Sequence, residues 1–404
     1  MPHPSKRFFH MTDSNRWLLP EGIDEALPPL AERLETCRRR ILDLYHGWGY
    51  ELVMPPFVEY LESLLTGTGH GLDLQTFKLT DQLNGRLMGV RADMTPQVAR
   101  IDAHRLKREG VSRLCYVGTV LHTRPDGFAG SRSLLQLGAE LYGHAGLASD
   151  VEILRLMLET LAVCEVDTPC VDLGHVGIFR SLAADAALDP EQETRLFDLL
   201  QRKALPEIRT CLAQLPITAD QRRRLGVLAD LNGDRDTLDR ARIELAGADD
   251  AVMISLDALE HLAQAVQASH PDVTLHVDLA ELRGYHYHTG LVFAAYLPGN
   301  GQEVARGGRY DDIGRVFGRA RPATGFSADL KTLVRLSRCP ERAAPGGILA
   351  PADPDPALNH AIVDLRCRGE RVIQGLDGQN NDAVALGCDR VLVKTNNQWT
   401  VVDA

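Results

Sequence analysis

The longest uniform feature of the sequence is a helix-forming block over residues 180–270 that interrupts a series of strand-like segments. Within this block, apolar residues recur at helical spacing, as at Leu196, Leu199 and Leu200. Strand signals resume at residues 275–279, and neither side of the block shows a regular alternation of one strand with one helix. This pattern favours an α+β fold over a doubly wound parallel sheet.

Two segments outside the block carry the clearest strand signals. Residues 114–121 and 134–142 are apolar and flank a connection rich in Arg, Gly, Pro and Asp, which predicts a long β-hairpin. Amphipathic helices are predicted over residues 27–46 and 149–161. The glycine-rich stretch 305–312 (ARGGRYDD) is expected to form a turn.

Between these elements, Thr95 is expected to cap a helix whose first residue is Pro96. Proline is tolerated at that position because its missing N–H has no partner in the first turn of a helix. Farther along the chain, another helix is expected to begin near Ala328.

The length of 404 residues exceeds what a single hydrophobic core usually supports. We expect a core over residues 1–340, with a helical insertion at about 180–270. Strand-like pieces alternate with one helix-like run in residues 341–404, which predicts a small C-terminal α/β domain. The net charge of −11 argues against a broad non-specific nucleic-acid surface, because such surfaces need clustered Lys and Arg.

Several function classes lack their sequence signatures. The chain contains no HExxH, GxSxG, GxGxxG or P-loop motif, and its eight cysteines form no CxxC pair, so we expect no metal and no cofactor. The N-terminus lacks the apolar run of a secretory signal, and no stretch has the length of a membrane span. A cytoplasmic protein without membrane attachment is therefore expected.

Four polar residues are spaced so that they can face one pocket. Gln136 and Glu140 share one face of a strand, and Asp93 and Thr95 share one face of the extended segment before Pro96. Carboxylates suit an ammonium or an imidazole N–H, and Arg283 could supply a planar fork for a carboxylate. A cradle for an amino acid is one interpretation; an ordinary solvated sheet face is the other.

The string at residues 283–290 (RGYHYHTG) is the most unusual one in the chain. In an extended segment, His286 and His288 would point to one face, with Tyr285 and Tyr287 on the other. The two histidines could hold a metal, but no carboxylate or cysteine lies within the string to complete the site. The alternative is a packed aromatic strand.

Residues from about 18 to 335 resemble the catalytic core of histidyl-tRNA synthetase, a class II synthetase fold with an antiparallel sheet flanked by helices. The resemblance is carried by four stretches: 50–59 (YELVMPPFVE), like the dimer-forming first class II motif; 114–143, like the second; 307–311 with 325–330, like the approach to the third and its start; and 283–287, like the histidine-specific motif.

The resemblance implies a histidine pocket. Asp93 and Thr95 match the positions that hold the amino group, with Asp where the synthetase usually has Glu. Gln136 and Glu140 match the orienting and imidazole-reading positions. The histidine-specific motif contributes the remaining candidates: Arg283, Tyr287 and His288, the last in place of a second tyrosine.

The ATP side departs from the synthetase pattern. The arginine and glutamate of the second motif are replaced by His122 and Thr123, and the Glu-Arg pair of the third motif falls on Lys331 and Thr332. Loss of such electrostatic groups typically costs about 10²–10³ in rate each, so adenylate formation is expected to be crippled. The C-terminal residues are too few for the anticodon-binding domain, so tRNA binding is not expected.

A synthetase core with these losses is similar to the regulatory subunits of ATP phosphoribosyltransferase, as are the strings VLHTRP and ELRGYHYHTGLVFAAY. That family implies a non-catalytic chain that self-dimerises within a hetero-oligomer. Its partner would be the short-form catalytic subunit, and L-histidine would be the feedback effector. Two alternatives stay open: an active histidyl-tRNA synthetase-type enzyme, and a stand-alone histidine-binding scaffold.

Overall fold

The computed structural model describes residues 17–66, 70–125, 130–282, 284–285, 287–338, 346–378 and 381–404. The chain divides into two compact units, Met1–Arg338 and Cys339–Ala404. Among the described residues, no helix has the length and apolar character needed to cross a membrane.

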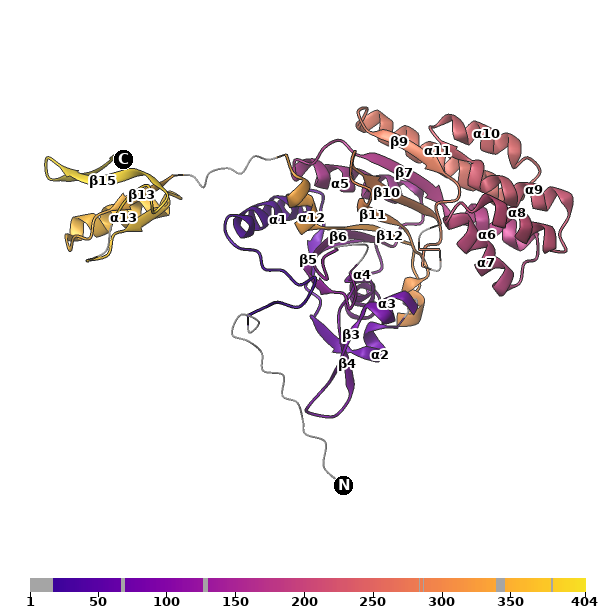
Figure 1. The fold of residues 1–404 in the computed structure, drawn as a ribbon, viewed down its shortest axis with the longest axis horizontal. Helices are drawn as coiled ribbons and strands as arrows, with labels where there is room; N and C mark the ends of the chain where they lie inside the picture. The colour runs from indigo at the N-terminus through magenta and orange to yellow at the C-terminus, as the bar shows by residue number, and fades with distance from the viewer. Residues whose placement is uncertain are drawn as a thin grey trace, which may run out of the picture. The chain divides into compact units, whose positions relative to one another are not determined.

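A mixed sheet forms the centre of the first unit, with nine strands among the described residues (Figure 1). From edge to edge the strands are β1 (Glu51–Leu52), β5 (Ser112–Leu121), β6 (Ser133–Tyr142), β12 (Ala323–Asp329), β11 (Glu303–Arg309), β10 (Leu291–Tyr296), β7 (Cys170–His175), β9 (Thr274–Asp278) and β8 (Asn232–Gly233). Neighbouring strands are antiparallel except β1–β5 and β7–β9. The α+β prediction is therefore confirmed.

The predicted hairpin is confirmed by strands β5 and β6, which pair in register from Ser112 opposite Tyr142 to Leu121 opposite Ser133. Strand β12 pairs with the other edge of β6 and places Gly325 opposite Glu140. Side chains alternate between the two faces of a strand, so β6 directs Leu137 and Ala139 into the main core and Gln136 and Glu140 to the opposite face.

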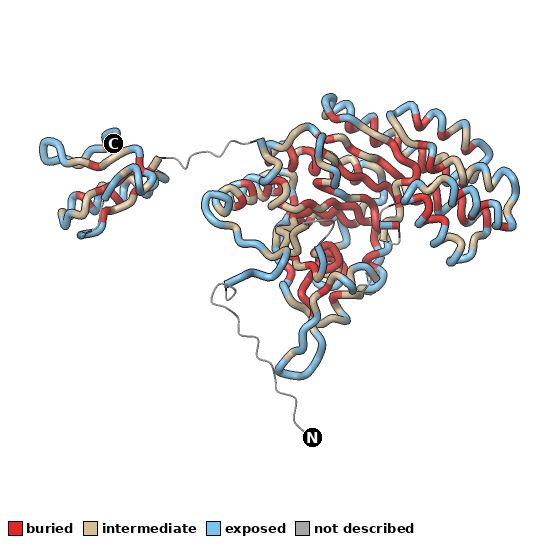
Figure 2. The backbone as a smooth tube through the Cα atoms, viewed as in Figure 1, coloured by how far each residue is buried: buried red, intermediate tan, exposed pale blue. Residues whose placement is uncertain are grey.

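Helices α1 (Leu30–Gly47), α5 (Leu147–Val163) and α12 (Leu330–Leu336) are among those that lie against the main-core face of the sheet. Helix α1 buries Leu34, Cys37, Ile41 and Tyr45, which are spaced three and four residues apart and so form one stripe. Figure 2 shows the buried strands at the centre of this unit. The helices predicted over 27–46 and 149–161 are confirmed.

The helix-forming block is helical from Val176 to Ser269, apart from loops and β8. Its elements are α6 (Val176–Asp185), α7 (Pro190–Gln201), α8 (Leu205–Gln214), α9 (Ala219–Val227), the 3₁₀-helix η3 (Leu228–Asp230), α10 (Asp236–Glu244) and α11 (Asp250–Ser269). Asp189 and Thr218 begin α7 and α9 with capping boxes, which satisfy the first free N–H groups of each helix.

The other face of the central sheet is covered by a smaller layer. It contains a three-stranded sheet of β2 (Val58–Tyr60), β4 (Leu87–Val90) and β3 (Phe77–Thr80), with α2 (Leu61–Leu64), α3 (His70–Gln75), α4 (Thr95–Arg100), the π-helix η2 (Ile101–Leu106) and the 3₁₀-helix η4 (Ile313–Phe317). Met94 and Val98 of this layer join a second core that includes Tyr116 and Tyr310. The connection from β4 to α4 contains Met94 and belongs to this layer. It therefore lies over the β5–β6 hairpin, which carries Tyr116.

Three local predictions are wrong. Thr95 is the first residue of α4 and does not cap it, because its hydroxyl contacts the Tyr116 hydroxyl. The stretch 305–312 is largely strand β11, which pairs on both sides despite its glycines. The N–H groups of Tyr287 and His288 both donate to the Gly284 carbonyl, so these described residues form a turn and not the extended segment considered from the sequence. By contrast, the helix expected to begin near Ala328 is confirmed as α12, which begins at Leu330 directly after strand β12 ends at Asp329.

The second unit has its own sheet and core. Its elements are β13 (Gly347–Ala350), α13 (Pro356–Cys367), β14 (Val372–Gln374), β15 (Cys388–Thr395) and β16 (Gln398–Asp403), with strand order β14-β13-β15-β16. Ile348, Leu358, Ile362 and Leu392 are buried together between the helix and the sheet. Asp355 begins α13 by accepting a hydrogen bond from the Ala357 N–H.

Candidate functional site

Glu140 lies at the bottom of the candidate site, on the face of β6 opposite the main core, and its side chain is almost fully buried at 1% exposure. The Tyr116 hydroxyl donates to Glu140 Oε1 at 2.9 Å, and the Tyr310 hydroxyl donates to Oε2. Burial raises the pKa of Glu140 to about 8, although the two hydroxyl donors partly oppose the shift. The folded chain therefore holds a buried carboxyl group that is mostly protonated at pH 7.

Asp93 and Gln136 form a half-buried polar pair beside this carboxyl group. Gln136 Nε2 donates to Asp93 Oδ1 at 2.8 Å, and Gln136 Oε1 accepts from the Met94 N–H at 2.9 Å. Asp93 Oδ1 also accepts from the Thr95 N–H, which holds the start of α4 against the hairpin. Thr95 Oγ1 lies 3.0 Å from the Tyr116 hydroxyl, so the pair is linked to Glu140 through one tyrosine.

Aromatic rings form another side of the site. Tyr287 stacks on Tyr310, with ring centroids 4.9 Å apart, and His288 meets Tyr287 edge-on at 5.3 Å. Burial lowers the pKa of His288 to about 4, so this imidazole is neutral at pH 7. Among the described residues, the buried Tyr287 hydroxyl has no hydrogen-bond partner. Such a group usually finds a partner, and a bound polar ligand would supply one.

Six of the seven predicted site residues form one network. They contact one another directly or through Tyr116 and Tyr310, and they are Asp93, Thr95, Gln136, Glu140, Tyr287 and His288. The seventh, Arg283, lies outside the described residues, as does His286. The described part of the chain contains no group of three or more His, Cys, Asp or Glu residues suited to a metal ion.

Glycines make room for these side chains. A Cβ on Gly325 would lie 1.5 Å from Glu140 Oε2, and one on Gly138 would lie 2.4 Å from the Tyr116 hydroxyl oxygen. Both glycines lie on the strands that flank or carry Glu140. Close approach of a buried side chain to a strand backbone is a known reason for glycine inside a sheet.

Sequence reasoning missed the two tyrosines that hold Glu140. Tyr116 lies opposite Gly138 in the hairpin register, and this pairing of a large side chain with a glycine was a signal available once the hairpin was predicted. Tyr310 follows β11 and is 170 residues from Glu140 in the sequence. Its role depends on a pairing of β6, β12 and β11 that local patterns do not encode.

The residues at the expected ATP positions are engaged with other parts of the chain. Lys331 Nζ donates to Asp24 Oδ1 at 2.9 Å and to the Ser133 carbonyl at 2.7 Å. Thr332 contacts Asp329 through both its N–H and its hydroxyl, within the first turn of α12. His122 Nε2 lies 2.9 Å from the Ala92 carbonyl oxygen and the side chain is buried.

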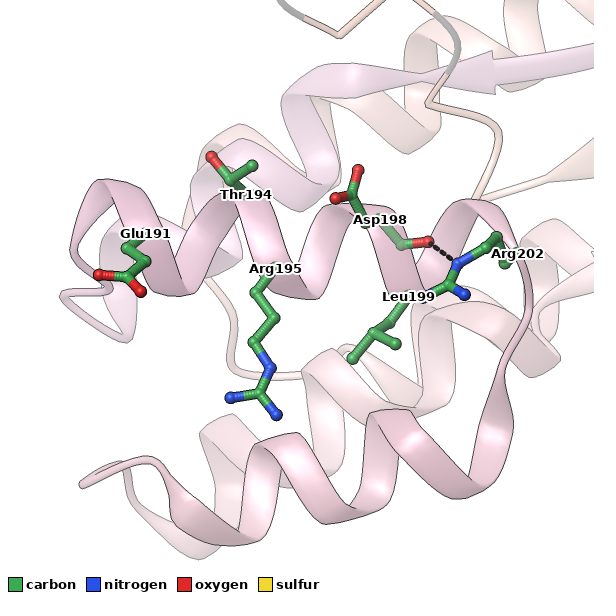
Figure 3. Close-up of a pocket in the computed structure, with 6 residues that line it drawn as sticks. All are labelled: Glu191, Thr194, Arg195, Asp198, Leu199 and Arg202. Carbon is green, nitrogen blue, oxygen red and sulfur yellow. Dashed lines mark hydrogen bonds between the residues drawn. The ribbon is translucent and has the colours of Figure 1, made fainter.

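Two surface hollows lie away from these residues. The first, of about 450 Å³, runs along α7 and is lined by Glu191, Thr194, Arg195, Asp198, Leu199 and Arg202 (Figure 3). The labelled side chains spread along one helix and point in different directions, so they do not converge on a ligand. The second, of about 760 Å³, lies between η2 and η4 and contains none of the predicted site residues.

Comparisons with known proteins agree with this architecture. A family model described as "Histidyl-tRNA synthetase" matches residues 22–333, and one described as "ATP phosphoribosyltransferase subunit HisZ C-terminal domain" matches residues 345–402. An ATP phosphoribosyltransferase regulatory subunit from Thioalkalivibrio sulfidiphilus is 73% identical over 97% of this chain and all of its own length. The chain belongs to the family of ATP phosphoribosyltransferase regulatory subunits.

Other members of this family are also similar to the chain. The regulatory subunit from Alkalilimnicola ehrlichii is 60% identical over 94% of both chains. A solved structure, named as an ATP phosphoribosyltransferase regulatory subunit/histidyl-tRNA synthetase from Bacillus halodurans, is 27% identical, with a TM-score of 0.79 over 92% of this chain and 96% of its own. This similarity establishes that the chain itself has the class II synthetase fold.

Proposed function

We propose that this chain is a non-catalytic cytoplasmic subunit that associates with a short-form ATP phosphoribosyltransferase catalytic chain, supports its activity and binds L-histidine as a feedback inhibitor. The observation that carries the proposal is the buried carboxyl group of Glu140, held by two tyrosine hydroxyls beneath Asp93 and Gln136. A pocket with one buried acid and a polar rim suits a small zwitterion with a polar side chain.

We propose that each part of histidine is bound by one or more of the predicted site residues. Asp93 and Thr95 would receive the ammonium group, and Gln136 would fix its orientation by holding Asp93. The imidazole would lie between Glu140 and Tyr287, whose hydroxyl would gain the hydrogen-bond partner that it lacks among the described residues. Arg283 is proposed to contact the α-carboxylate.

The contacts of Lys331 support a chain without synthetase activity. Its ammonium group is held by Asp24 and the Ser133 carbonyl, so it offers no free cation to a nucleotide phosphate. We therefore propose that the chain neither forms an adenylate nor charges tRNA. Histidine-dependent exchange of ATP with pyrophosphate by the pure chain would contradict this assignment.

Self-association is part of the proposal. Residues 50–59 expose several large apolar side chains: Leu52, Met54 and Phe57 are 42%, 79% and 41% exposed. Neighbouring exposed apolar side chains of this size often mark a protein interface. A second copy of this chain is the proposed partner at that segment, within a hetero-oligomer.

The test is the phosphoribosyltransferase rate of the short catalytic chain from the same source, with and without this protein and then with added histidine. We expect activation that histidine reverses. Glu140→Ala should weaken inhibition about 5- to 150-fold, because a buried ligand group left without its hydrogen-bond partner costs about 1–3 kcal/mol. In the absence of histidine, the Glu140→Ala variant should still activate the catalytic chain.

A matched control is Glu207→Ala, which removes an exposed carboxylate of α8 outside the site. It should leave both activation and inhibition unchanged. Failure of the protein to change the catalytic rate would contradict the regulatory function. Equal inhibition of the wild type and Glu140→Ala would contradict only the placement of histidine in this pocket.

A further inference from the structure

Two cysteines from different helices meet inside the main core of the first unit. Cys37 on α1 and Cys164 at the end of α5 have sulfur atoms 2.9 Å apart, although they are 127 residues apart in the sequence. Their side chains are buried, at 8% and 3% exposure. We propose that these two thiols form a reversible disulfide, which links α1 to α5 when the protein is exposed to hydrogen peroxide.

The local geometry suits such a bond. A disulfide requires two sulfur atoms that can approach to about 2 Å, and the sulfur atoms of this pair already lie 2.9 Å apart. The helices that carry the thiols pack on each other, and Arg40 on α1 donates to Glu165, the residue after Cys164, at 2.9 Å. This ion pair holds the two backbone segments together beside the sulfurs.

The two thiols differ in reactivity. The hydrogen bond with Cys164 lowers the pKa of Cys37, and the Arg40 charge lowers it further against the effect of burial. The hydrogen bond with Cys37 and burial raise the pKa of Cys164. Cys37 is thus the thiolate that reacts first, because the thiolate is the nucleophilic form of cysteine.

The chemistry balances with hydrogen peroxide as the oxidant. The Cys37 thiolate attacks one peroxide oxygen, the O–O bond breaks, and the sulfenic acid and hydroxide form; the hydroxide takes a proton to become water. Cys164 sulfur then attacks the Cys37 sulfur, the S–O bond breaks, and the thiol proton leaves with the hydroxide as a second water. A dithiol reductant reverses the step by thiol–disulfide exchange.

The end of the first unit is anchored beside this pair. The Arg338 N–H donates to the Glu165 carbonyl at 2.9 Å, and Arg33 of α1 donates to the Val334 carbonyl at 3.1 Å. A bond between Cys37 and Cys164 would stiffen the helices that hold this segment. The inference goes beyond the proposed regulatory function and does not depend on it.

The experiment treats the full-length protein with a small excess of hydrogen peroxide, blocks free thiols, digests without reductant and analyses the peptides by mass spectrometry. We expect a peptide pair joined through Cys37 and Cys164 that disappears on treatment with dithiothreitol. On a non-reducing denaturing gel the oxidised chain should migrate faster, because the bond closes a long loop, and its Tm should rise by several degrees.

Cys37→Ser and Cys164→Ser should each abolish the faster band, whereas Cys115→Ser should retain it. Cys115 is a matched control because it is also a buried core thiol, and burial raises its pKa to about 12. The proposal is overturned if both thiols of the wild type are recovered as separate blocked peptides after oxidation. That measurement uses the native chain and remains decisive even if a variant fails to fold.

Discussion

The ionisation of a single buried residue, Glu140, differs between the folded and the unfolded chain. Glu140 is surrounded by Tyr116, Tyr310 and the backbone of β12, so its carboxylate form has little water around it. The pKa of about 8 in the folded chain exceeds its ordinary value of 4.5. The folded protein therefore binds a proton at Glu140 in a pH range where the unfolded chain has released it.

This difference predicts how stability depends on pH. Between about pH 4.5 and 8 the unfolded chain holds fewer protons at Glu140 than the folded chain does, so the contribution of this residue to stability falls as pH rises. Glu140→Gln lacks the ionisation, and its unfolding free energy relative to wild type should increase over this range. One pKa unit corresponds to about 1.4 kcal/mol, so a gain on the order of a few kcal/mol is expected.

The measurement is chemical denaturation of both proteins at several pH values from 5 to 9 in the absence of histidine. Comparing the two proteins cancels the other titrating groups. A stability difference that stays constant across this range would show that Glu140 has an ordinary pKa.

The site was only partly predictable at this scale. The alternation of side chains along a strand was enough to place Gln136 and Glu140 on one face. The extended conformation expected before Pro96 was enough to place Asp93 and Thr95 on one face. The tyrosines that hold Glu140 were not predicted, because Tyr116 reaches it across the β5–β6 pairing and Tyr310 across the β11–β12 and β12–β6 pairings. Thr95 also does not cap α4 as threonine often does, because its hydroxyl contacts the Tyr116 hydroxyl instead.

At the scale of elements, strand β12 decides whether β6 can carry a buried acid. Gly325 lies directly opposite Glu140, and a Cβ there would lie 1.5 Å from Glu140 Oε2 and 2.8 Å from the Ala139 carbonyl oxygen. The carbonyl belongs to the sheet and has little freedom to move. The space for the Glu140 carboxyl group therefore depends on a missing side chain on the neighbouring strand.

Gly325→Ala is predicted to displace the Glu140 side chain, lower the unfolding free energy by about 1–3 kcal/mol and weaken histidine binding. Gly301→Ala is the control, since a Cβ at Gly301 would meet no atom within 4 Å. Thermal unfolding and calorimetric titration with histidine measure the two effects. Equal Tm and affinity in both variants would contradict the role of the glycine.

The elements that were predicted correctly share a strong local pattern. The β5–β6 hairpin has two apolar runs around a polar connection, and α1 has a regular apolar stripe. Strand β11 has neither an apolar run nor an apolar stripe. Glycines occupy two of its seven positions, so little apolar pattern remains to be detected. Its pairing with β10 and β12 supplies the stability that its local sequence does not.

At the scale of the whole molecule, the two compact units have separate hydrophobic cores. Every described contact of the site is made within Met1–Arg338, and Cys339–Ala404 has its own buried core. A chain that ends at Arg338 should therefore fold and bind histidine with an affinity within about twofold of the full chain, because a site built within one domain needs no help from another. Circular dichroism and calorimetric titration check this, and a folded but non-binding product would contradict it.

The contacts of Lys331 also bear on how this chain could change over evolutionary time. Replacing Lys331 alone would free Asp24 and the Ser133 carbonyl from their shared cation, while His122 would still be held at the Ala92 carbonyl. A lineage that began to gain nucleotide chemistry would lose existing contacts at the first substitution and gain a working site only after several. Selection acting one mutation at a time would therefore meet a barrier, so the proposed non-catalytic state would be hard to leave.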